Sequence, residues 1–156
     1  MSNGDDQTVS FSLRSDSDGE ITVKILGYEQ PHAADVSDAN WLNAEVIFKS
    51  GGCYFRYNAN ITTSDIKYFL DSLEKVLVTL EGVASFLTDE EDIILNLQFN
   101  KLGAVNIVGE LKDMSFPKTK LTFELSSDQS FFSSVCSDLR YLSKKYPVIE
   151  SVADRS

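Results

Sequence analysis

The 156-residue chain carries 24 acidic and 14 basic residues, which gives a net charge of −10, and 42% of its residues are hydrophobic. This length suits one domain that buries a core without disulfide or metal support. The acidic balance argues against direct nucleic-acid binding, which requires clustered Lys and Arg, and no segment approaches the ~18 consecutive apolar residues of a membrane span.

Alternating apolar residues at the start predict two strands, about 9–13 and 21–25, joined by a turn with Asp18-Gly19. An irregular acidic stretch follows over residues 29–40, the longest predicted loop. Binding residues tend to collect on loops, so Asp35 and Asp38 are candidate contact residues; a plain polar connector is the alternative.

The next segment predicts a hairpin and then the main helix. Period-2 alternation over 42–49 and 53–61, with Gly51-Gly52 between, indicates two strands. From Thr62 to Leu80 apolar residues recur at helical spacing, which predicts an amphipathic helix. Its start is also indicated, because the Thr62 hydroxyl can cap the first turn while Asp65 reaches back.

Four more strands are expected at about 83–87, 93–99, 105–111 and 121–125, before a helix from about Asp128 to Tyr146 that stops at Pro147. The turn Asp89-Glu90-Glu91-Asp92 places four carboxylates together. Consecutive turn residues diverge and no histidine lies near, so a solvated turn or an interaction surface is favoured over a metal or acid–base site.

The pattern of the first helix and the strand before it recurs 66 positions later, so the chain reads as four strands and a helix, twice, with halves at about 8–80 and 81–146. We therefore expect an α+β fold: an eight-stranded, strongly twisted antiparallel sheet with two helices on one face, pseudo-repeated ββββα-ββββα. The whole chain, 1–156, is expected to be a single domain with flexible tails at 1–7 and 150–156.

The uncovered face of such a sheet is polar and rich in amides, and it is either solvated or a wet protein-binding surface. Its residues would be Tyr54, Arg56, Asn58, Asn60, Asn96, Gln98, Asn106 and Glu124.

Catalytic motifs are missing from the sequence. It contains no phosphate loop, nucleophile elbow or metal-ligand spacing, and the one histidine, His32, lies in the acidic loop. We predict no catalytic residues, no metal and no cofactor, while a carboxylate pair assembled in space stays open.

Several structural motifs between about residues 38 and 148 resemble bacterial immunity proteins of the WapI type. They are Trp41-Leu42 opening a strand, Gly51-Gly52 before an aromatic strand, Leu80-Glu81-Gly82-Val83-Ala84-Ser85-Phe86 after the helix, a strand pair around Gly103, and Leu121-Thr122-Phe123-Glu124 leading to Asp128-Gln129-Ser130-Phe131. The resemblance implies a non-enzymatic, cytoplasmic protein that binds and occludes the toxic domain of a cognate secreted toxin.

The charge distribution adds a hypothesis about the contact. The first 100 residues hold 17 acidic and 6 basic residues, and an acidic inhibitor can mimic the phosphates that a basic nuclease binds. The candidate partner-binding residues are Asp35, Asp38, Asp89, Glu90, Glu91, Asp92, Tyr54 and Arg56. The alternative is a non-catalytic small-ligand or housekeeping binding module.

Overall fold

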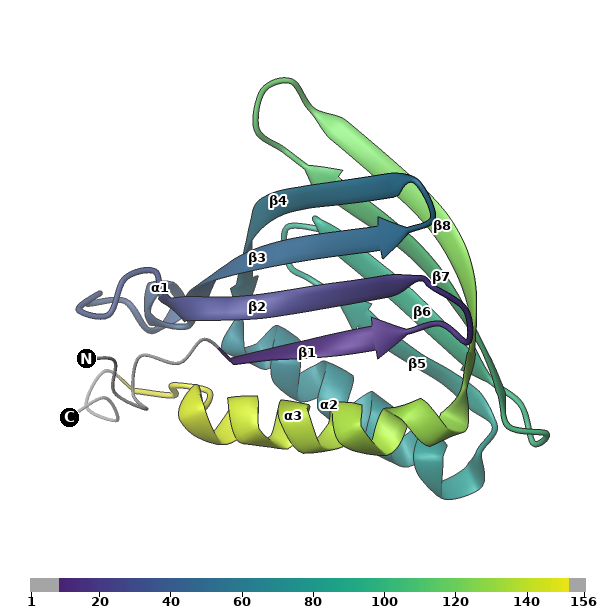
Figure 1. The fold of residues 1–156 in the computed structure, drawn as a ribbon. Helices are drawn as coiled ribbons and strands as arrows, with labels where there is room; N and C mark the ends of the chain where they lie inside the picture. The colour runs from purple at the N-terminus through teal and green to yellow at the C-terminus, as the bar shows by residue number, and fades with distance from the viewer. Residues whose placement is uncertain (1–8, 152–156) are drawn as a thin grey trace, which may run out of the picture.

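The structure is a computed structural model that describes residues 9–151, and these form two four-stranded antiparallel sheets and three helices (Figure 1). The first sheet contains β1 (Val9–Arg14), β2 (Glu20–Tyr28), β3 (Trp41–Ser50) and β4 (Cys53–Thr62) in that order. The second contains β5 (Gly82–Leu87), β6 (Ile93–Phe99), β7 (Ala104–Asp113) and β8 (Thr119–Asp128). The tails expected at 1–7 and 150–156 lie outside the described residues, except for 150 and 151.

The α+β class and the positions of the eight strands agree with the sequence prediction, but the single eight-stranded sheet is wrong. The helix α2 (Thr63–Thr79) begins where β4 ends and packs against β5, so β5 starts a new sheet instead of pairing with β4. Four strands followed by a helix occur twice, with the one-turn helix α1 (Val36–Ala39) inserted before β3. The internal repeat itself stays a prediction.

The two sheets pack face to face, and their inward side chains bury each other. Phe48 of β3 stacks on Phe123 of β8, with ring centroids 4.6 Å apart, which joins the sheets directly. The expected single polar face is therefore split: Tyr54, Arg56, Asn58 and Asn60 lie on the first sheet, and Asn96, Gln98, Asn106 and Glu124 lie on the second.

The long helices line one side of this sandwich instead of covering one face of a sheet. α3 (Phe132–Lys145) packs on β1, α2 packs on β5, and the two helices pack on each other (Figure 1). Rings from all three layers meet in the core, where Phe69 of α2 lies 5.7 Å from Phe11 and 5.1 Å from Phe86 between ring centroids. The opposite side, between β4 and the second sheet, has no helix over it (Figure 1).

The helix starts follow the local signals in the sequence. At α2 the predicted capping box is confirmed: Asp65 N–H donates to Thr62 Oγ1 at 3.1 Å, and Thr62 N–H donates to Asp65 Oδ2 at 2.8 Å. The last helix starts later than expected, because the short 3₁₀ segment η2 (Gln129–Phe131) precedes α3. None of the helices in the described part of the chain is long and apolar enough to cross a membrane.

Candidate functional site

The two acidic segments singled out from the sequence both border the first turn of α2. On one side Asn40, which follows α1, accepts the Thr63 N–H on its carbonyl oxygen at 3.0 Å and the Thr63 hydroxyl on its side chain. On the other side Asp89 lies close enough to Asp65 for its backbone N–H and its charge to influence the pKa of the Asp65 carboxyl. Acids that are more than 50 residues apart in sequence are thereby placed around one helix terminus.

Five of the six candidate acids are exposed: Asp35, Asp38, Asp89, Glu90 and Glu91. Asp35 accepts the Ser37 N–H at 2.7 Å and caps α1, which gives the acidic loop an ordered turn that the sequence pattern did not reveal. Among the described residues none of the five forms an ion pair. This end of the molecule therefore presents carboxylates that no base in residues 9–151 pairs with.

Asp92 differs from the other acids, because it is only 6% exposed. Its Oδ1 accepts the Thr88 hydroxyl at 2.7 Å and its Oδ2 accepts the Asn60 N–H of β4 at 3.3 Å. Its backbone oxygen accepts the Tyr57 hydroxyl and the Lys112 N–H. Asp92 therefore joins the two sheets and is not available as a surface charge. Burial also raises the pKa of its carboxyl.

Beside Asp92 a groove of about 650 Å³ opens between the two sheets, on the side without helices. Its walls come from β4, from the turn between β5 and β6, and from the end of β7 with the loop that follows. The lining residues are Arg56, Tyr57, Asn58, Asn60, Glu90, Asp92, Lys112, Asp113, Met114 and Ser115. The groove thus brings together three residues of the predicted set: Arg56, Glu90 and Asp92.

The two candidate residues on β4, Arg56 and Tyr54, differ in their surroundings. Arg56 donates through both Nε, at 2.7 Å, and Nη2 to the carboxylate of Glu45 on β3, so its charge is already paired. Tyr54 is exposed outside the groove lining, and the Lys49 ammonium lies 5.9 Å from its ring centroid. Asp35 and Asp38 also lie outside the groove lining.

The sequence predicts a turn between β7 and β8, but the candidate partner-binding residues include none from this loop. Phe116 in this loop is 96% exposed and Met114 is also exposed. The available signal was the run Met114-Ser115-Phe116-Pro117, since large apolar side chains are unusual in a turn bounded by proline.

The described residues show no clustering of metal ligands. They contain no group of three or more His, Cys, Asp or Glu side chains that could hold a metal ion. The groove provides amide, carboxylate, guanidinium and phenol groups, which hydrogen-bond and pair charges. Its arrangement suits recognition of a polar surface.

The chain matches the model of the immunity protein WapI-like family over residues 12–147, which includes β2 to β8, the second half of β1, both long helices and every residue of the groove. No curated protein matches the chain.

Proposed function

Because the chain belongs to the WapI-like immunity protein family, we propose that it binds the toxic domain of a cognate secreted bacterial toxin in the cytoplasm and occludes that domain's active site. The observation that carries the proposal is the set of exposed, unpaired acids around the start of α2: Asp35, Asp38, Asp89, Glu90 and Glu91. We further propose that the partner is basic, as a nuclease that binds phosphates is.

The physical argument rests on complementary charge. A surface with unpaired carboxylates attracts a basic partner over a Debye length of about 8–10 Å and can raise the association rate toward ~10⁸–10⁹ M⁻¹s⁻¹ at low salt. Because the five acids are exposed, their pairing with partner bases avoids the large desolvation penalty of buried ion pairs. They should therefore act mainly on the association rate and its dependence on salt.

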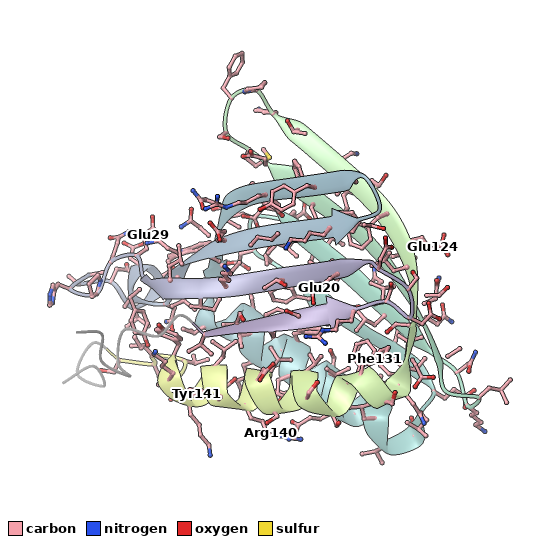
Figure 2. The ribbon with its side chains drawn as sticks, viewed as in Figure 1. Glu20, Glu29, Glu124, Phe131, Arg140 and Tyr141 are labelled. Atoms are coloured by element: carbon pink, nitrogen blue, oxygen red, sulfur yellow. The ribbon has the colours of Figure 1, made fainter. Side chains whose placement is uncertain are left out.

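The test compares two variants that lose equal charge. The first combines Asp38→Asn, Asp89→Asn, Glu90→Gln and Glu91→Gln. The control combines Asp16→Asn, Glu81→Gln, Glu124→Gln and Asp138→Asn, exposed acids on other parts of the surface. Glu124, for example, lies on β8 (Figure 2). Binding to the purified toxin domain encoded beside the gene is measured from 50 to 300 mM salt, and protection is measured by co-expression.

We expect the first variant to associate about tenfold more slowly at low salt, with a smaller difference at high salt, and to protect cells less well. The control should stay close to the wild-type protein. Equal effects of the two variants would show that net charge matters and not this surface. A wild-type protein that neither binds nor protects against that toxin domain would contradict the proposed function itself.

The groove supports the alternative function, a non-catalytic small-ligand binding module. A volume of about 650 Å³ lies within the range of roughly 300–1,000 Å³ that is typical of small-molecule sites, so a small polar ligand could bind there. Native mass spectrometry of the protein purified from its host separates the two possibilities: a retained small molecule favours a ligand-binding module, and a retained basic protein favours the immunity function.

A further inference from the structure

The β7–β8 loop projects away from both sheets, and Phe116 lies in it (Figure 1). At 96% exposure this ring differs from the other described phenylalanines, of which the next most exposed, Phe131, is at 36%. An aromatic side chain contributes to folding through the area it buries, and Phe116 buries almost none. Burial in the core therefore does not explain a phenylalanine at this position.

The loop is held in a defined conformation by its own hydrogen bonds. Asp113 Oδ1 accepts both the Ser115 N–H, at 3.1 Å, and the Ser115 hydroxyl, at 2.6 Å. The Thr119 hydroxyl donates to the Pro117 carbonyl at 3.3 Å, and Asp113 pairs with Thr119 at the end of the strand ladder. An exposed ring on an ordered loop loses less conformational entropy on binding than a ring on a flexible segment does.

This loop and the groove form one continuous surface, since Met114 and Ser115 line the groove. The bases that line the groove are already paired: Arg56 with Glu45, and Lys112 with Glu110 at 3.2 Å.

Of the three acids in the same lining, Asp92 is buried, and Glu90 and Asp113 form no ion pair among the described residues. Lys118 places one positive charge in the loop beyond Phe116. The unpaired charge in the groove beside Phe116 is therefore negative, which complements a basic rim on a partner.

We propose that Phe116 is the apolar anchor of the toxin interface. Its ring enters an apolar pocket of the toxin domain, and basic side chains at the edge of that pocket face Glu90 and Asp113 across the groove. This inference rests on the proposed function and adds to it the site where binding energy is concentrated. Buried aromatic anchors surrounded by polar contacts dominate the energy of many protein interfaces.

The experiment compares Phe116→Ala with Leu102→Ala. Leu102 is 95% exposed in the turn between β6 and β7, at the far end of those strands from the groove, so it matches Phe116 in exposure and type of segment. Association and dissociation rates are measured with the purified, catalytically inactivated toxin domain encoded beside the gene, at 50 and 300 mM salt. Thermal unfolding checks that both variants fold.

We expect Phe116→Ala to weaken binding by about thirtyfold, the equivalent of a hot-spot residue, through faster dissociation and to a similar extent at both salt concentrations. Leu102→Ala should change affinity by less than about threefold, and neither variant should lower the melting temperature noticeably. Phe116→Leu should keep part of the affinity.

The outcomes separate this inference from the function on which it rests. If Phe116→Ala binds as tightly as Leu102→Ala while the wild-type protein binds the toxin domain, the anchor is disproved and the immunity function stands. If the effect of Phe116→Ala disappears at high salt, the contact is electrostatic and the anchor is disproved as well. If the wild-type protein binds no toxin domain, the proposed function and the anchor fail together.

Discussion

At the scale of single residues, Asp92 shows how one acid of a charged turn can have a structural role. Its neighbours Asp89, Glu90 and Glu91 are exposed, whereas Asp92 turns inward and accepts hydrogen bonds from Thr88 and from Asn60 of the other sheet. These bonds favour the ionised form, but burial disfavours it more and raises the pKa. The native state therefore holds the Asp92 proton more tightly than the unfolded chain does.

This pKa shift makes stability depend on pH in a defined direction. An unfolded aspartate ionises near pH 4, so between that pH and the raised native pKa the native state binds more protons, and stability falls as pH rises. The Asp92→Asn variant has no carboxyl to ionise at this position, so it does not lose stability in this way as pH rises. We therefore expect the stability of Asp92→Asn, relative to wild type, to increase as pH rises from 4 toward 7 in urea unfolding.

Asp128 supplies a control with the opposite sign. It accepts the Ser130 N–H at 2.9 Å, and this hydrogen bond lowers its pKa, so its contribution to stability is lost as pH falls. Relative to wild type, Asp128→Asn should therefore lose stability as pH rises over the acidic range. Curves for Asp92→Asn that run parallel to wild type at every pH would contradict the argument from burial.

At the scale of elements, the pairing of β7 with β8 depends on a glycine. Gly109 lies opposite Phe123 in the ladder, and a Cβ atom on Gly109 would come 2.1 Å from Phe123 Cζ. The Phe123 ring can lie across β7 and still stack on Phe48 because no side chain occupies that position. The close approach of the Phe123 ring therefore requires a glycine at position 109 of β7.

We expect Gly109→Ala to destabilise the protein by about 1–3 kcal/mol, because the added methyl group displaces the ring. In a Phe123→Ala background the same change should cost much less, a non-additivity that a double-mutant cycle in urea measures directly. Gly52→Ala is the control, since no atom lies within 4 Å of its Cβ position. Equal losses at Gly109 and Gly52 would show that backbone freedom, and not the ring, explains the glycine.

The elements themselves were predictable because their signals are local. The alternation in each strand and the Thr62–Asp65 capping box require only neighbouring residues, and both are confirmed. The division into two sheets was not predictable, because alternation shows which side chains share a face and not which strand lies beside β4. The inward turn of Asp92 depends on a contact with Asn60, 32 positions away, which no local pattern records.

At the scale of the whole molecule, the two halves share one core. Phe11 and Phe69 come from the first half and Phe86 from the second, and their ring centroids lie 5.1–5.7 Å from one another. Neither half can cover its apolar faces alone, because the sheets cover each other and α3 of the second half covers β1 of the first. We therefore propose that residues 9–151 unfold as a single domain.

Unfolding monitored by two probes tests this proposal. Trp41, the only tryptophan, reports on β3 in the first half, and far-UV circular dichroism reports on both halves. We expect coincident transitions, and Phe69→Ala should shift both by the same amount, about 3–5 kcal/mol. Transitions that separate, or a variant that shifts only one of them, would indicate two independent units.

The strand order also bears on how the chain reaches this structure. Within each sheet every strand pairs with its neighbour along the chain, so all ladders can form as hairpins with small loop-closure entropy. Contacts between the halves, such as Phe48 with Phe123, are separated by 75 positions and need both meanders in place. Docking of two preformed meanders is therefore the expected slow step of folding, and the apolar faces stay open to aggregation until it is complete.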